Sequence, residues 1–350
     1  MNNIEYKKLA SNTIANLSFP LTIYVVIEHC FITNSGNSII DAIFKILGSP
    51  SISSVFFVIS GYLFFQNISK YDFNTYKNKL GNRFKSLLIP YFIANTFMIL
   101  CYGLMHYFTP HLINPDNFNV LKFSFKEFIF AYYDAAGGFP ICYPLWYIRN
   151  LYIIVIISPL LYLILKQTPV VKIMGGVTIG VIYCLFDFAF FIGVFYFYLG
   201  ALLSQNDIES YIVKYHNRFK LGIFIILAIF FITIYLNYIN YHVEIYESIM
   251  RFSGVILTII LAFHLSKRCR FKGIIFHSSF FIYLYHAFLV FVLKELLIMV
   301  INPTSTIMWI ITYISLILIT IFILVSAFFI LNKYLPSFTA IITGGRSNKK

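Results

Sequence analysis

Long apolar runs recur along the chain and are separated by short polar segments. A mostly apolar run of about 20 residues is long enough to cross the hydrocarbon core of a membrane as a helix. The pattern therefore predicts an all-α fold, a polytopic membrane helix bundle with about ten transmembrane helices. The predicted spans are residues 14–34, 50–68, 86–108, 143–165, 169–187, 189–204, 221–240, 249–266, 273–293 and 307–331.

The composition supports this class. Hydrophobic residues make up 60% of the 350 residues and charged residues only 11%, whereas a soluble domain has about 25% charged residues. The mean hydropathy is +0.82. We expect no cleaved signal peptide, because residues 1–12 are polar and the first apolar run lacks a small-residue cleavage site. A transmembrane domain over 14–335 is expected between a cytoplasmic N-terminal segment, 1–13, and a cytoplasmic basic tail, 336–350, whose end, "GGRSNKK", is predicted to be disordered.

The basic residues are unevenly distributed among the predicted loops. Most of the 26 lysines and arginines lie in the two termini and in alternate loops of the predicted topology. Cytoplasmic loops carry this excess, so both termini are predicted to face the cytoplasm. The net charge of +13 is then an orientation signal, and no nucleic-acid partner is expected because no basic-aromatic module is present. The five cysteines show no CxxC spacing, which favours free thiols over disulfides or a metal site.

The segment over residues 109–142 does not fit a regular span. It contains Pro110, Pro115 and the turn-like "AAGGFP". The stretch "FKEFIFAYY" within it is too short to cross and predicts an interfacial or re-entrant helix. No repeat relates the two halves of the chain, which lowers a transporter interpretation without excluding it.

Ionisable side chains inside a membrane are costly and usually mark function. Glu28 and His29 lie side by side in the first span, within "YVVIEHCF". A neutral imidazole can act as a general base, and it can equally be a packed histidine with one satisfied hydrogen bond. Glu28 can orient His29, pair with an arginine or cap a polar mouth. These alternatives stay open.

Two further stretches carry polar groups into spans. Small residues at Ser60 and Gly61, in "FFVISGYLF", favour close helix packing, with a nucleophilic serine as the less favoured alternative. In "YPLWYIRNLYI", Trp146 and Tyr147 fit an outer aromatic belt. Arg149 either snorkels outwards or binds a sugar hydroxyl or carboxylate, or stabilises an oxyanion.

His286, in "SSFFIYLYHAFL", falls in the outer half of the ninth predicted span, at a depth like that of His29. Two histidines and an arginine at one level predict a shared polar chamber open to the outside. On the other side, Arg83 and Lys85 lie at the cytoplasmic start of the third span. Positive-inside anchoring accounts for their charge, and a phosphate contact is the functional alternative.

Taken in order, six stretches carry a resemblance over residues 12–335. The chain resembles the acyltransferase 3 family of bacterial integral-membrane O-acyltransferases. The stretches are "VVIEHC", "FFVISGYLF", "RFKSLLIPY", "PLWYIRNLY", "FYFYLGALLS" and "SSFFIYLYH".

The resemblance implies a role for each matching residue. His29 matches the catalytic base of the family, with Glu28 holding or orienting it, and Arg83, with Lys85 beside it, matches a contact to the acyl donor. Trp146 and Arg149 match residues of the family that line the site, Ser60 matches the serine of its FFxxSG pattern, and His286 matches a histidine of its late span. The residues that we expect to bind the substrate are these four and Tyr147. The family usually has an arginine eleven residues before the histidine of the first span; here that place is Ser18.

The function that this implies is transfer of acetyl from acetyl-CoA to a hydroxyl of a cell-surface polysaccharide or lipid-linked sugar. The expected place is the inner membrane of a bacterium, with acyl-CoA, a glycan acceptor and membrane lipid as partners and no metal. The alternative is a polysaccharide or lipid-linked glycan exporter or flippase without acyl transfer, and the serine at position 18 also keeps an inactive scaffold open. The acceptor sugar and the oligomeric state are not readable from the sequence.

Overall fold

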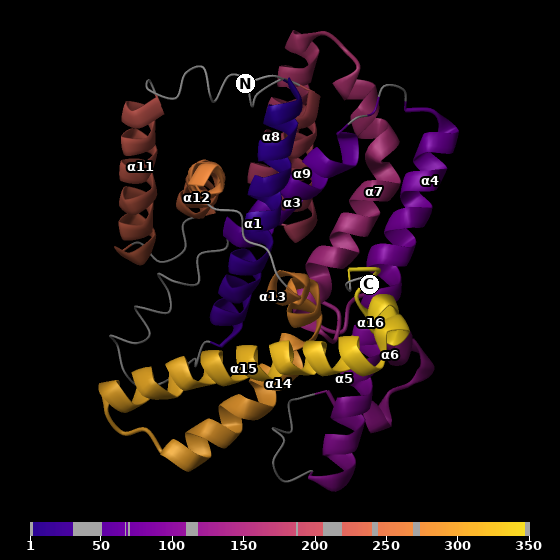
Figure 1. Cartoon of the computed structure of the whole chain (residues 1–350), viewed down its shortest axis with the longest axis vertical. Helices are drawn as coiled ribbons and strands as arrows, with labels where there is room; N and C mark the ends of the chain where they lie inside the picture. Colours follow the sequence, from indigo (N-terminus) through magenta and orange to yellow (C-terminus); the bar gives the residue numbers. More distant parts are fainter. Residues whose placement is uncertain are drawn as a thin grey trace. The chain divides into compact units, whose positions relative to one another are not determined.

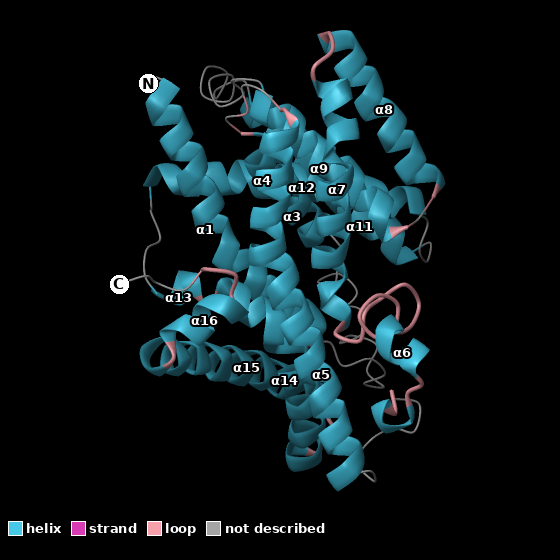
Figure 2. Cartoon of the chain, turned by 90° about the vertical axis from the view of Figure 1, so that its right-hand side faces the viewer, coloured by secondary structure: helices cyan, strands magenta, loops and turns pink. Residues whose placement is uncertain are grey.

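The regular secondary structure of the described residues is helical, with loops and turns between the helices (Figure 2) and an isolated β-bridge between Ala136 and Phe139. Each of the ten predicted spans overlaps one of these helices. The computed structural model describes residues 3–30, 51–66, 68, 71–109, 118–186, 188–205, 219–239, 244–268 and 274–346.

Within the described residues, five helices are long and apolar enough to cross a membrane by length and composition. They are Phe73–Phe108, Tyr143–Leu165, Ile245–Ser266, Ser279–Ile301 and Thr306–Tyr334. The predicted class, an all-helical integral membrane protein, is confirmed at this level. The number of ten crossings and the cytoplasmic side of both termini stay predictions.

Contacts divide the chain into two compact units that are interleaved in sequence. The first comprises Met1–Tyr24, Thr33–Leu80 and Ile153–Lys272, and the second comprises Val25–Ile32, Gly81–Tyr152 and Gly273–Lys350. The helices of the first unit are α3 (Ser51–Phe65), α8 (Pro169–Leu185), α9 (Ala189–Gln205), α11 (Phe219–Ile239) and α12 (Glu244–Arg268), with most of α1 (Asn3–His29), α4 (Phe73–Arg83) and α7 (Trp146–Leu165).

In the first unit, two glycines let α3 and α9 approach closely. A Cβ added to Gly61 of α3 would lie 2.0 Å from the carbonyl oxygen of Phe197, and one added to Gly200 of α9 would lie 2.0 Å from that of Val58. The backbones therefore touch where any side chain would clash. This supports the packing interpretation of the small pair in "FFVISGYLF", and Ser60 beside Gly61 is half-buried.

Gly61→Ala is expected to destabilise the protein by about 1–3 kcal/mol, because the added methyl group meets backbone atoms that cannot move alone. The thermal unfolding midpoint in detergent measures the effect. The matched control is Gly222→Ala in α11, where no atom lies within 4 Å of the new Cβ and alanine is the better helix former. Equal unfolding midpoints for the two variants would contradict the close α3–α9 contact.

Arg251, on α12, is the buried arginine of the first unit and is 7% exposed. Its Nη1 donates to the Tyr183 hydroxyl at 3.0 Å, and that hydroxyl donates to Ser248 Oγ at 3.0 Å. The guanidinium also lies 6.0 Å from the centroid of the Tyr183 ring, a favourable cation–π distance. This network links α12 to α8.

The second unit is built around an antiparallel helix pair, α14 (Ser279–Ile301) and α15 (Thr306–Tyr334), which lie side by side in Figure 1. α14 ends at Asn302, whose φ of 46° is the left-handed conformation that terminates helices. Pro303 follows, and the Ser305 side chain caps α15 by accepting from Met308 N at 3.3 Å. The remaining helices of this unit are η1 (Phe84–Leu88), α5 (Ile89–Phe108), η3 (Val120–Lys122), α6 (Phe125–Phe130), η4 (Tyr143–Leu145), α13 (Ile274–His277) and α16 (Pro336–Ile342).

The start of the ninth predicted span is wrong by several residues. The apolar pattern predicts a helix over 273–293, whereas the structure has a short α13 and then α14, which begins at Ser279. The hydroxyls of Ser278 and Ser279 both bond back to carbonyls of α13, those of Ile275 and Phe276, at 2.6 and 2.7 Å. His286 therefore lies in the first third of its helix and not in the second half.

The segment over 109–142 is confirmed as no regular span in its described part. It forms η3, the short α6 expected from "FKEFIFAYY", and a turn in which Gly137 and Gly138 have φ of 59° and 84°. Ser124 and Glu127 form a capping box at the start of α6. Hydrogen bonds from the Ser124 hydroxyl and N–H lower the pKa of Glu127, so the cap weakens only as the pH falls through that lowered value. Pro110 and Pro115 lie outside the described residues.

The end of the chain is ordered further than the sequence predicts. After α16, which packs on α5 and α15, Gly344 and Gly345 have φ of 60° and 83° and turn the chain back. A Cβ on Gly344 would lie 2.2 Å from the Ser86 carbonyl oxygen, so only glycine permits this approach. The expectation of disorder is wrong for 344–346, and 347–350 lie outside the described residues.

Candidate active site

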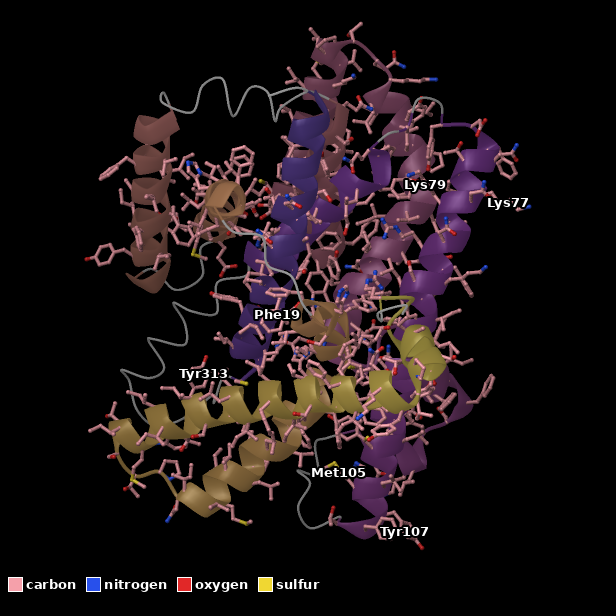
Figure 3. All side chains as sticks on the ribbon, in the orientation of Figure 1. Phe19, Lys77, Lys79, Met105, Tyr107 and Tyr313 are labelled. Carbon is pink, nitrogen blue, oxygen red and sulfur yellow. The ribbon has the colours of Figure 1, made fainter. Side chains whose placement is uncertain are left out.

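The histidines from the first and ninth predicted spans lie against each other in the second unit. The rings of His29, at the end of α1, and His286, on α14, stack with centroids 5.1 Å apart and an interplanar angle of 23°. Tyr313 of α15, labelled in Figure 3, donates to the Ile27 carbonyl at 3.0 Å and fixes the end of α1 that carries His29. Two imidazoles from helices far apart in sequence are therefore in direct contact.

The tautomer of His286 follows from its partners. Its Nδ1 lies 2.9 Å from the Tyr283 carbonyl oxygen and 3.2 Å from that of Ile282. Carbonyl oxygens only accept hydrogen bonds, so Nδ1 carries the proton and the neutral ring presents a lone pair at Nε2. That Nε2 is fully buried and has no hydrogen-bond partner among the described residues. A buried acceptor without a partner is rare in proteins and points to a group that arrives from elsewhere.

His29 has a different partner. Its Nδ1 lies 2.8 Å from the Tyr143 hydroxyl, and the two rings meet edge to face with centroids 4.9 Å apart. The Glu28 carboxylate is within electrostatic range of the same hydroxyl. Glu28 and His29 therefore share a neighbour, Tyr143, which the sequence pattern does not mark.

Backbone bonds hold the segment that carries Tyr143. The Tyr283 hydroxyl donates to the Pro144 carbonyl at 2.5 Å. Cys142 N donates to Asn95 Oδ1 at 3.2 Å, and Asn95, which is fully buried on α5, anchors itself by donating to the Tyr91 carbonyl at 2.9 Å. η4 is thus fixed to both α14 and α5, which gives Tyr143 one position beside His29.

Arg149, on the first turns of α7, is held by side-chain and main-chain groups. Its Nε and Nη2 both donate to Asn150 Oδ1 at 3.1 Å, and its Nη1 donates to the Tyr133 carbonyl. The guanidinium lies 5.0 Å from the centroid of the Tyr133 ring. Of the five N–H groups of an arginine, two have no partner among the described residues. Arg149 therefore has hydrogen-bond partners within the protein and does not need to extend to the membrane surface to find them.

The two aromatic residues before Arg149 differ in their neighbours. The Trp146 ring meets that of Phe139 at 6.5 Å between centroids. The Tyr147 ring meets that of Tyr283 edge to face at 6.2 Å, and Tyr283 in turn lies 6.2 Å from His286. Tyr147 is thus one ring away from the histidine pair, whereas Trp146 lies toward the turn that contains Phe139.

Arg83 and Lys85 flank the start of a π-helix, η1, just before Pro90 of α5. Such wide turns are frequent at functional sites. Arg83 is half-buried and Lys85 is exposed. Arg83 is within electrostatic range of the Tyr147 hydroxyl.

Ser60 is the candidate that belongs to the first unit, on α3. All the other candidates belong to the second unit. No group of three or more His, Cys, Asp or Glu side chains suited to a metal ion occurs in the described part of the chain. Cys30, Cys101, Cys142 and Cys184 are free, as predicted, and Cys269 lies outside the described residues.

A family model described as an acyltransferase domain matches residues 21–331, most of the chain. This chain belongs to the acyltransferase 3 family. The ordered set of stretches that suggested the resemblance is thereby confirmed, and the protein is a membrane-embedded member of an acyltransferase family.

A curated relative is the succinoglycan biosynthesis protein ExoH of Rhizobium meliloti (strain 1021). It is 27% identical to this chain over 136 residues, which are 39% of this chain and 34% of ExoH. The match thus spans about a third of the length of that relative. No solved structure matches this chain.

Proposed function

We propose that this protein transfers an acetyl group from acetyl-CoA to a hydroxyl group of a polysaccharide or a lipid-linked sugar. The observation that carries the proposal is the stacked pair of His29 and His286, in which His286 Nε2 is oriented and has no partner in the described part of the chain. Membership of an acyltransferase family gives the reaction class. The similarity to a succinoglycan biosynthesis protein supports a glycan as the acceptor.

His29 is the general base of the proposed reaction. It takes the proton of the acceptor hydroxyl while that oxygen attacks the thioester carbonyl. The tetrahedral adduct then expels the coenzyme A thiolate, which recovers the proton from the His29 imidazolium. Tyr143 holds the His29 ring through its Nδ1, and the Glu28 carboxylate favours the imidazolium through Tyr143. General base catalysis of this kind contributes about 100- to 10,000-fold.

His286 and Arg149 are proposed to bind the acceptor and to stabilise the charge that develops in the reaction. His286 Nε2, an acceptor held in place by the Nδ1 bonds, accepts a hydrogen bond from a second hydroxyl of the acceptor sugar, because the reacting hydroxyl gives its one proton to His29. The two N–H groups of Arg149 without a described partner suit the developing oxyanion. A fixed donor at that position contributes about 3–4 kcal/mol in a dry site. Trp146 and Tyr147 remain proposed lining residues of the substrate site, and the role of Ser60 in substrate binding stays a prediction from the sequence.

The donor is proposed to enter from the side where Arg83 and Lys85 lie, which the charge pattern assigns to the cytoplasm. Acetyl-CoA is the soluble thioester of that compartment, and the inner membrane of a bacterium is the proposed location. The row of Tyr147 and Tyr283 rings links the neighbourhood of Arg83 to His286. One donor molecule is proposed to have its charged end near Arg83 and its thioester near the histidines.

The test is direct. Purified full-length protein in lipid nanodiscs, given acetyl-CoA labelled in the acetyl group and an oligosaccharide acceptor, is expected to transfer label to the sugar or to release coenzyme A slowly by hydrolysis. An exporter or flippase would move glycan across a vesicle membrane with no loss of label from acetyl-CoA. That second outcome would replace the acyltransferase proposal with the transport alternative.

A further inference from the structure

The last described residue, Arg346, is positioned by contacts on three sides. Its Nη1 donates to the Ser86 carbonyl of the π-helix η1 at 2.8 Å and to the Thr343 carbonyl at 3.1 Å. The flat face of its guanidinium lies 3.9 Å from the centroid of the Phe280 ring. Its Nε and Nη2 have no partner among the described residues, so one edge of the guanidinium stays available.

Arg83 lies beside Arg346. It is the N-cap residue of η1 and lies three residues before Ser86, whose carbonyl accepts the hydrogen bond from Arg346. The two guanidiniums are close enough to repel each other, and both are within electrostatic range of the Tyr147 hydroxyl. Burial, followed by the like charge of Arg83, lowers the pKa of Arg346 to about 10. The sequence predicts this end of the chain as a disordered tail, so the pair was not expected.

The pair lacks compensating negative charge. No carboxylate forms an ion pair with Arg83 or Arg346 among the described residues, and the structure gives no hydrogen bond to the Arg83 side chain there. Two adjacent, partly buried cations are unfavourable without an anion. The glycines that dock Arg346 against Ser86 show that this placement is specified by the backbone.

We propose that Arg83 and Arg346 together bind a phosphate group at the nucleotide end of the acyl donor. Two guanidiniums suit a ligand with at least two negative charges and several acceptor oxygens, which a phosphate monoester or diphosphate supplies and a single carboxylate does not. The assignment to the donor rests on the proposed function. It is favoured over a lipid headgroup because Tyr147 lies within range of both arginines and starts the row of rings that ends at His286.

The experiment measures binding and needs no turnover. Full-length protein is placed in nanodiscs of phosphatidylcholine alone, and the Kd values for coenzyme A and for pantetheine, which lacks phosphate, are measured by calorimetry. Arg346→Ala is expected to raise the Kd for coenzyme A about 10- to 100-fold, as loss of a charge-assisted hydrogen bond does. Pantetheine is expected to bind equally weakly to both proteins. Arg346→Lys is expected to recover part of the loss, because it restores charge without the planar fork.

Lys77→Ala is the matched control, because it removes one positive charge from the exposed surface of α4, where Figure 3 labels Lys77. It is expected to leave the Kd unchanged. If Arg346→Ala unfolds at a lower temperature than the parent, Arg83→Gln, which removes no hydrogen bond seen in the structure, carries the same test.

A Kd for coenzyme A that neither arginine affects would overturn the proposal. The proposal would also be overturned if the phosphate came from a lipid headgroup. In that case phosphatidylglycerol, but not coenzyme A, would raise the unfolding temperature of the parent protein, and Arg346→Ala would lose that increase. Failure of the proposed function is a separate result. In that case coenzyme A binds through Arg346, yet no acetyl group is transferred.

Discussion

His29→Ala is expected to lower the rate of acetyl transfer by about 100- to 10,000-fold while the Kd for coenzyme A stays near that of the parent. The reason is that the variant removes the proposed proton acceptor at the reacting hydroxyl, whereas the proposed phosphate contacts lie at Arg83 and Arg346. The measurement is single-turnover transfer of labelled acetyl to an oligosaccharide by protein in nanodiscs. An unchanged thermal unfolding midpoint shows that the loss is chemical.

Two further variants make this test specific. Tyr143→Phe removes the hydroxyl 2.8 Å from His29 Nδ1 and keeps the ring, so a smaller loss and a displaced pH–rate profile are expected if Tyr143 positions His29. His106→Gln changes a histidine on α5 whose Nε2 contacts the Phe118 carbonyl, and it is expected to be active. Acetyl transfer by His29→Ala at the parent rate would show that the base is another group.

The sequence predicts the elements well because each is a local property of the chain. Every predicted span overlaps a helix, since a run of apolar residues both crosses lipid and forms backbone hydrogen bonds within itself. The error in the ninth span has a local cause as well. Residues from Gly273 to Ile301 form an almost continuous apolar stretch, and hydropathy alone does not show that the hydroxyls of Ser278 and Ser279 divide it.

The site is predicted only in part, because its contacts join residues far apart in sequence. The similar depth of His29 and His286 in their predicted spans was enough to suggest that they meet, and they stack. Tyr143 gives no comparable signal, since it is one of 27 tyrosines and looks like a belt residue at a helix end. Asn95 and Asn150 gave a usable signal that was not followed, because a lone amide inside an apolar span needs a partner.

At Arg346 the sequence predicts too little structure, because it predicts disorder where the chain is ordered. Two glycines followed by charged and polar residues are typical of a disordered end, and the sequence analysis predicts one there. The same glycines adopt positive φ and bring Arg346 to the Ser86 carbonyl. Whether a Gly-Gly pair marks flexibility or a tight approach depends on the surface that it meets, and here that surface is a π-helix whose geometry no simple sequence pattern predicts.

His286→Phe is expected to lower kcat/KM for acetyl transfer by about 10- to 100-fold. The decrease is expected to be larger for the kcat/KM of the sugar acceptor than for binding of coenzyme A. Phenylalanine keeps an aromatic ring against His29, so the loss reports the imidazole nitrogens and not the stack. The proposed reason is that Nε2 accepts a hydrogen bond from a second hydroxyl of the sugar, beside the one that reacts. A buried group left without its partner costs about 1–3 kcal/mol, which matches that range of rates.

Two amide substitutions distinguish the roles of the two ring nitrogens of His286. Asparagine places an N–H near the position of Nδ1, so His286→Asn can keep the bonds to the Ile282 and Tyr283 carbonyls and lose the acceptor. Glutamine places its amide near the position of Nε2, so His286→Gln is expected to be the more active of the two. Equal rates for His286→Asn and His286→Gln would show that His286 only packs. Higher activity in His286→Gln, with equal unfolding midpoints for the two variants, would assign the acceptor contact to Nε2, a buried nitrogen that the fold orients and that has no partner among the described residues.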